Sequence, residues 1–237
     1  ARSVAITVRV ASFAYTGSPY CQNQSDPLPV LDAGGLAGTF SSSPGLVFLD
    51  SSTGQIDLSS SLSGTYTVTN TVPVAGCGTL TATNTITISG LVWIGTLSTD
   101  WNIQGNWSCG FVPYSTTQVQ IPDVANKPVI NSGVTAEVRN ITVENGSSLT
   151  VASGTLRIFG SVTSNSGVDA SGGTVEFAGS SGQSVGNNVF TGNTVGNLTV
   201  NNNSGVALLG SLNVRGVVLV QNGNLASDGH LTLLSDT

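Results

Sequence analysis

Short triplets, each with an apolar residue on both sides of a mostly polar one, recur through the second half of this chain. They constrain its fold more than any other feature. Gly, Asn or Ser residues bound each triplet, so each predicted strand is only three or four residues long. Strands this short bury little surface alone, but they form a continuous core when each is one side of a stacked coil. The triplets occupy residues 141–143, 149–151, 156–158, 175–177, 198–200, 212–214 and 231–233.

We therefore predict a right-handed parallel β-helix, or β-solenoid, over residues 117–237. Three triplets per coil give coils of roughly 20 residues and about five or six coils in all. The Asn-rich segments at 201–205 and 221–224 suit left-handed corner conformations. A second β-sandwich is the competing interpretation, but the triplets are too short and too regular for it. The last residues carry no polar cap, so we expect the solenoid to be truncated or covered, because an open end exposes unpaired strand edges.

The composition excludes several classes of function. Charged residues make up 8% of the chain, against about 25% in ordinary soluble proteins, and Ser, Thr, Asn and Gly take their place. The net charge is −6 and there is no basic patch, so the attraction to phosphate on which nucleic-acid binding depends is missing. No apolar run approaches the roughly 18 residues that cross a bilayer. A surface of neutral hydroxyls and amides suits a secreted protein.

The first part of the chain has a different pattern. Residues 11–90 contain six or seven apolar runs separated by turn residues, which is typical of an immunoglobulin-like β-sandwich. Within this segment, Asp50 and Gly54 flank a turn between two strands, and Tyr66 and Val68 face one side of the next strand. Residues 1–10 resemble residues 82–88, so we expect them to be the last strand of a preceding repeat.

Three cysteines remain, none in a metal-type spacing. Cys21 and Cys77 both fall within the predicted sandwich. We expect a disulfide between them, which would close a loop of about 56 residues and add about 3 to 4 kcal/mol by restricting the unfolded chain. Cys109 is then left as a buried thiol.

The three tryptophans, Trp93, Trp101 and Trp107, gather in residues 91–116, between the two predicted domains. We expect this segment to be a cap that covers the first coil of the solenoid, because solenoid ends need such protection. Aromatic faces beside Asp and Asn side chains could instead stack on sugar rings. A glycan site at these tryptophans is therefore the alternative.

The acidic residues favour no enzyme. Polysaccharide-cleaving β-helices need acidic and basic side chains clustered on one face. Here the acids are spread along the solenoid, although Glu137, Glu144 and Glu176 could lie on nearby strands, and His230 has no Ser or Asp partner in a recognisable order. Asp50 and Asp57 could hold calcium at a turn, but no Asp-x-Asp run supports this. We predict no metal and no cofactor. The solenoid acids are Asp123, Glu137, Glu144, Asp169, Glu176, Asp228 and Asp236.

The chain resembles the repeat modules of giant Bacteroidetes cell-surface adhesins. The resemblance lies in the sequences at 13–21, 38–46 and 50–54 and in the Trp-rich signature at 93–113, which is similar to the opening of their solenoid segments. It implies type IX secretion, an extracellular location at the cell surface, and a role in adhesion or gliding. It implies no catalytic residues.

The sequence thus predicts an all-β, non-enzymatic segment of a larger surface protein, serving as a stalk or filament module. Its expected partners are neighbouring modules of the same long chain, with surface glycans or other cell-surface proteins as further candidates. A carbohydrate-binding module built on the tryptophans is the first alternative. A polysaccharide-active β-helix enzyme is the second.

Overall fold

A computed structural model describes residues 8–76, 78–165 and 167–234. The chain forms two compact units, Ala1–Ser89 and Gly90–Thr237. Almost all the regular structure is β-strand, and one short 3-10 helix, η1 (Gln104–Asn106), is present in the described segments. The expectation that residues 1–10 end a preceding repeat falls mostly outside the described residues.

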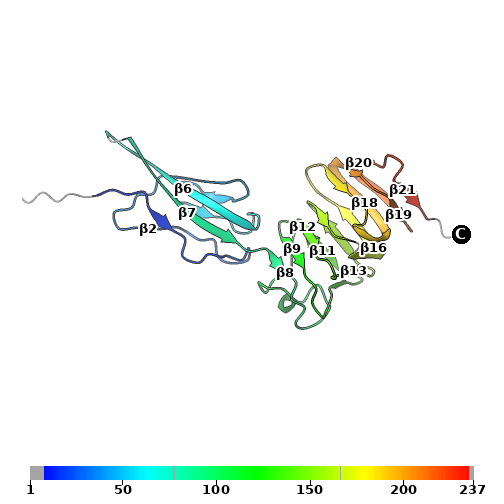
Figure 1. The fold of residues 1–237 in the computed structure, drawn as a ribbon. Helices are drawn as coiled ribbons and strands as arrows, with labels where there is room; N and C mark the ends of the chain where they lie inside the picture. Colours follow the sequence, from blue (N-terminus) through cyan, green and yellow to red (C-terminus); the bar gives the residue numbers. More distant parts are fainter. Residues whose placement is uncertain (1–7, 77, 166, 235–237) are drawn as a thin grey trace, which may run out of the picture. The chain divides into compact units, whose positions relative to one another are not determined.

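The first unit is built from antiparallel strands (Figure 1). β6 and β7 form a long hairpin and β3 pairs with β6, while β1 pairs with β2 and β4 with β5. An antiparallel all-β unit is therefore established, whereas its immunoglobulin-like identity stays a prediction. The strands are β1 (Phe13–Ala14), β2 (Val30–Leu31), β3 (Thr39–Ser42), β4 (Phe48–Asp50), β5 (Gln55–Ile56), β6 (Gly64–Val74) and β7 (Gly78–Ile88).

One apolar core holds the first unit together. Phe13 packs edge-on against Phe40, with ring centroids 5.2 Å apart, and Tyr66 and Val68 are buried on the same side of β6 as predicted. The buried Asn70 side chain donates hydrogen bonds to the carbonyls of Ala11 and Leu36. This buried amide fixes the path of two loops that carry no strand of their own.

The second unit is a parallel β-solenoid over residues 118–233, as the triplets predict. Each triplet lies in a strand, and strands in successive coils pair in parallel (Figure 1). The strands are β8 (Leu91–Val92), β9 (Gln118–Ile121), β10 (Val129–Ile130), β11 (Thr135–Val138), β12 (Asn140–Val143), β13 (Leu149–Val151), β14 (Thr155–Ile158), β15 (Val162–Thr163), β16 (Val168–Phe177), β17 (Gln183–Val185), β18 (Phe190–Leu208), β19 (Leu212–Val214), β20 (Val218–Ala226) and β21 (Leu231–Leu233).

The register of one face illustrates the coil length. Ala136 pairs with Leu156, Leu156 with Val175, Val175 with Leu198, and Leu198 with Val218. Successive partners are thus 20, 19, 23 and 20 positions apart along the chain. Longer steps occur where extra residues are accommodated in a corner, so the apolar pairs remain stacked although the repeat length varies.

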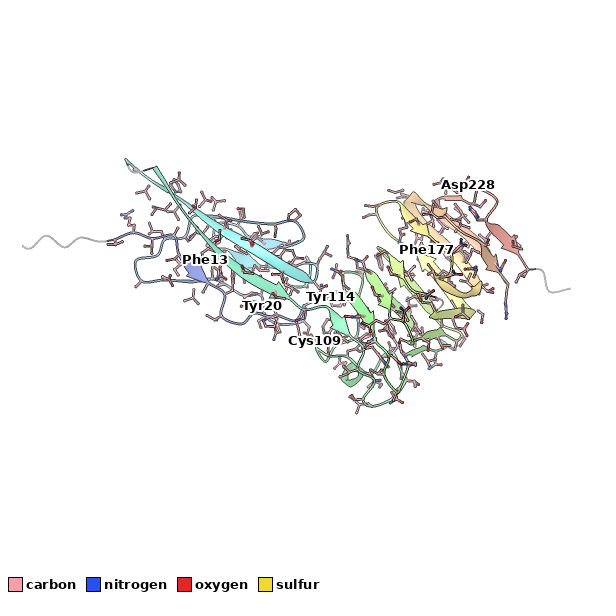
Figure 2. All side chains as sticks on the ribbon, viewed as in Figure 1. Phe13, Tyr20, Cys109, Tyr114, Phe177 and Asp228 are labelled. Carbon is pink, nitrogen blue, oxygen red and sulfur yellow. The ribbon has the colours of Figure 1, made fainter. Side chains whose placement is uncertain are left out.

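The inward side chains of the triplets form one apolar column. Leu156, Val175 and Val200 are fully buried, and Phe177, which is labelled in Figure 2, is 1% exposed. At the last coil this burial ends, because Leu233, although at an inward position, is 61% exposed. The buried apolar column therefore extends to β19, and the inward side chains Val220 of β20 and Leu233 of β21 are exposed.

Some solenoid strands are longer than the expected three or four residues. β16, β18 and β20 continue pairing around corners, with register shifts where Gly and Asn residues turn the chain. Between β11 and β12, by contrast, the chain turns a corner at Arg139, and the adjacent polar residues Arg139 and Asn140 interrupt the alternation there.

Candidate functional site

The three tryptophans lie inside the second unit and cover the first coil. β8 pairs in parallel with β9, and Asp100 bridges to Val129, so this segment adds an incomplete coil to the stack. Trp93 and Trp101 are fully buried and Trp107 is 1% exposed. All three belong to the same apolar core as the solenoid strands.

The rings pack against each other rather than presenting open faces. Trp107 lies edge-on to Trp93 and to Trp101, at centroid distances of 4.9 and 4.7 Å, and its indole N–H donates to the carbonyl of Trp101 at 2.9 Å. The fully buried Asn106 accepts hydrogen bonds from the backbone N–H groups of Leu97 and Ser98, which fixes the loop over the rings. Stacking on a sugar needs an exposed ring face, and these rings do not offer one in this arrangement.

The cysteines differ in part from expectation. Cys21 and Cys109 are both disulfide-bonded. The expectation of a free buried thiol at Cys109 is therefore wrong. Cys77, the expected partner of Cys21, lies outside the described residues. Spacing along the chain does not reveal pairing, because cysteines far apart in sequence can be adjacent in the fold.

The carboxylates at the turn of the first unit cap backbone groups. Asp50 accepts hydrogen bonds from the hydroxyl and the backbone N–H of Ser52, and these bonds lower the pKa of its carboxyl. Asp57 accepts bonds from the Ser59 hydroxyl and the Ser60 N–H. Among residues 8–76, 78–165 and 167–234, no group of three or more His, Cys, Asp or Glu side chains could hold a metal ion.

Two of the scattered solenoid acids are connected through their neighbours. Arg157 donates from Nη1 to Glu137 at 3.0 Å and from Nε to Glu176 at 2.9 Å. Glu176 then accepts from Asn201, and Asn201 from Asn222. These five side chains, one from each of five successive coils, are called the polar ladder below. The sequence allowed Glu137 and Glu176 to lie on nearby strands but did not indicate that Arg157 joins them.

The polar ladder does not have the properties of a catalytic pair. Both carboxylates are paired with one guanidinium, and the hydrogen bond to Glu176 above all raises the pKa of Arg157 above its ordinary value. General acid–base catalysis needs two groups aimed at one substrate, whereas these two carboxylates are both bonded to Arg157. Glu144 is not part of the polar ladder and accepts a hydrogen bond from Gln120. In the described part of the chain, no side chain pairs with the imidazole of His230.

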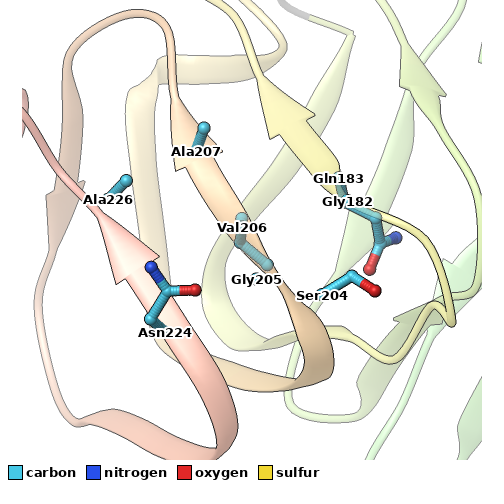
Figure 3. A pocket seen from close by; sticks show the side chains of 8 residues that line it. All are labelled: Gly182, Gln183, Ser204, Gly205, Val206, Ala207, Asn224 and Ala226. Atoms are coloured by element: carbon cyan, nitrogen blue, oxygen red, sulfur yellow. The ribbon is translucent and has the colours of Figure 1, made fainter.

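A shallow groove follows one corner of the solenoid. It consists of two hollows with volumes of about 290 and about 150 Å³, and Gly182 and Gln183 line both of them. This corner lies between β11, β14 and β16 on one side and β12, β15 and β17 on the other. Figure 3 shows the smaller hollow. The corner groove, as we call it, is lined by Arg139, Asn140, Phe159, Gly160, Ser161, Ser180, Ser181, Gly182, Gln183, Ser184, Ser204, Gly205, Val206, Ala207, Asn224 and Ala226.

The groove has a rigid base because buried amides bond it to neighbouring coils. Gln183 donates to the carbonyls of Ile158 and Gly160 and accepts from the N–H of Gly179 at 2.9 Å. The fully buried Asn202 donates to the backbone carbonyl of Ser181 and to the side-chain oxygen of Gln183. Most of these bonds join residues about 20 positions apart in neighbouring coils, and the bond to Gly179 closes a turn within one coil. Together the amides hold the corner in one shape.

Asparagine and glycine pair across coils at the corner groove and at one other corner. The side-chain oxygen of Asn140 accepts from the backbone N–H of Ser161, and that of Asn187 accepts from Ser211. Each acceptor Asn lies directly under a glycine, Gly160 or Gly210, where a Cβ atom would clash with the Asn side chain. An Asn followed about 20 residues later by Gly-Ser is thus a sequence signal that would have located these corners.

Removing the amide of Gln183 should weaken the solenoid measurably. Gln183→Leu leaves the N–H of Gly179 and two carbonyls without their partner, and we expect a loss of about 1 to 3 kcal/mol in the free energy of unfolding. Urea titration followed by tryptophan fluorescence measures this, because all three tryptophans lie in the second unit. The exposed Gln221 makes the control, and Gln221→Leu should be neutral. Equal effects of the two variants would contradict the bonding role of Gln183.

Comparison with known proteins adds little to the geometry. No curated protein and no solved structure matches the chain. In the described residues, no helix has the length and apolar character to cross a membrane. Residues 92–207, from the Trp-rich segment through most of β18, match a family described as a domain of unknown function, DUF8693.

Proposed function

We propose that this chain is a structural and adhesive segment of a large secreted bacterial surface protein, with the solenoid as its stalk. The observation that carries the proposal is the continuous apolar column of the second unit, which extends from the buried tryptophans to β19. Each coil adds length and buried apolar area while leaving the outer faces polar. Such a column provides a spacer that resists bending and proteolysis.

Further observations support the location and the partners. The disulfide-bonded state of Cys21 and Cys109 fits an oxidising compartment outside the cytoplasm. The resemblance to Bacteroidetes surface adhesins favours export by the type IX route and neighbouring modules of the same chain as partners. We also propose an immunoglobulin-like fold for residues 11–90 and a right-handed solenoid, since parallel crossover connections are overwhelmingly right-handed.

The alternatives have weaker support. A sugar platform at Trp93, Trp101 and Trp107 would need rings that are now buried to become exposed. A polysaccharide-active enzyme would need an acid and a base poised on one substrate, whereas Glu137 and Glu176 share Arg157 as their partner. We therefore propose a non-enzymatic role.

Labelling of intact cells tests the proposal. Antibodies raised against the recombinant chain should bind unbroken cells of the source bacterium, and brief protease treatment of those cells should remove the signal. Deleting the gene should reduce attachment or surface movement. A cytoplasmic protein probed in parallel controls for lysis. Labelling that appears only after the cells are broken would overturn the proposal.

A further inference from the structure

The corner groove has a lining suited to sugar hydroxyls. Ser180, Ser181 and Ser184 are exposed along it, and their hydroxyls make no hydrogen bond to other described residues. A serine hydroxyl both donates and accepts, which matches the mixed donors and acceptors of a sugar. Gln183 and Asn202 hold the backbone beneath these serines, so the hydroxyls are presented from a fixed surface, and binding would cost little ordering.

One end of the groove carries a positive charge. Arg139 and the half-buried Phe159 line the larger hollow together. The guanidinium of Arg139 forms no ion pair with the described residues, unlike that of Arg157. No lining residue of either hollow is acidic. In a chain of net charge −6, this is a local site where an anion would meet attraction instead of repulsion.

We propose that the corner groove binds a linear acidic glycan whose sugars carry carboxylates. A carboxylate would pair with the guanidinium of Arg139, which presents two parallel N–H donors. Neighbouring sugars would then lie over Phe159 and along Ser181 and Ser184 toward Ser204. The groove crosses successive coils spaced by about 4.8 Å, close to the length of one sugar residue in a chain. This spacing places successive coils of the groove beneath successive sugars.

A glycan fits these observations better than an acidic peptide. Extended peptides are usually held by backbone pairing to a free strand edge, whereas the groove runs across the coils, and at its smaller hollow it passes over β18, which pairs with β17 on one side and with β20 on the other. Hydroxyl groups and amides dominate the lining instead. The inference rests on the proposed adhesive role and names the class of ligand for it.

Isothermal titration of the whole chain with a galacturonic acid hexamer tests the proposal. The hexamer should bind more weakly as salt is added, and a neutral galactose hexamer should bind at least about tenfold more weakly. Arg139→Gln should weaken binding of the acidic hexamer about tenfold or more, and Arg139→Lys by less. Ser184→Glu places a carboxylate in the groove and should abolish binding. Arg215→Gln, an exposed arginine outside the groove, is the matched control and should bind as the original chain does.

Several results would overturn the proposal. These are no binding of the acidic hexamer, equal losses with Arg139→Gln and Arg215→Gln, or equally tight binding of poly-glutamate, which would indicate a general anion site. Unchanged tryptophan fluorescence and melting temperature establish that each variant is folded. Because the titration uses purified protein, its failure leaves the surface-labelling test of the proposed function unaffected.

Discussion

Replacing Phe177 with alanine is expected to lower the free energy of unfolding of the solenoid by about 3 to 5 kcal/mol. The Phe177 side chain is 1% exposed and lies in the apolar column, in register with Ile158 in the preceding coil and Val200 in the following one. Its removal leaves a cavity that neither neighbour can fill, because both are held in place by strand pairing on each side. A loss of this size is a large part of the stability of a typical domain.

Urea titration monitored by tryptophan fluorescence measures the effect of Phe177→Ala. Phe177→Leu keeps most of the volume and should cost less than about 1.5 kcal/mol. Leu219→Ala, which removes a half-exposed side chain from the outer surface of β20, serves as control and should change stability little. Because each coil contacts only its neighbours, the alanine variant could also unfold in two steps. A loss no larger than that of the Leu219 control would contradict the single apolar column.

Trp107→Ala should destabilise the second unit by a similar amount, about 3 to 5 kcal/mol. The ring is 1% exposed and contacts both Trp93 and Trp101, so its loss removes the centre of the cluster. We further expect the effect to be local. Amide hydrogen exchange should accelerate first in β8 and β9, which lie next to the tryptophans, and last in β18.

Leu97→Ala is the matched control for the tryptophan change, because Leu97 lies in the same segment but is 68% exposed. It should leave both stability and exchange nearly unchanged. Uniform acceleration across all coils would mean that the tryptophans stabilise the solenoid as a whole and not its first coil in particular. No acceleration would show that the segment is dispensable.

Much of the solenoid was predictable because its signal is local. The triplet at 156–158 alternates apolar, polar and apolar, and alternation alone determines that Leu156 and Ile158 face one side and Arg157 the other. The same applies to the triplet at 175–177. The turn at Asp50 and Gly54 was likewise readable, since Gly54 adopts a φ of +77° there. The corners were less readable, as Arg139 illustrates, because the corner there interrupts the alternation by a single extra polar residue, Asn140.

The candidate site was not predictable, because its residues come together only through stacking. Arg157 lies 20 residues from Glu137 and 19 from Glu176, and nothing in the local sequence distinguishes these acids from solvated ones. Gln183 and Asn202 occupy positions that a turn could equally expose to water. Their burial depends on which corner lies above and below them.

The sequence by itself determined that this chain is all-β, where its second half begins to stack, and which side chains of each triplet face inward. These properties follow from the pleat of a strand, which needs only neighbouring residues. The tertiary structure alone decided the register between coils, the partners of Arg157 and Gln183, the burial of the tryptophans and the lining of the corner groove. The reason is that coil length varies between steps, so contacts across coils depend on how the extra residues are accommodated in each corner.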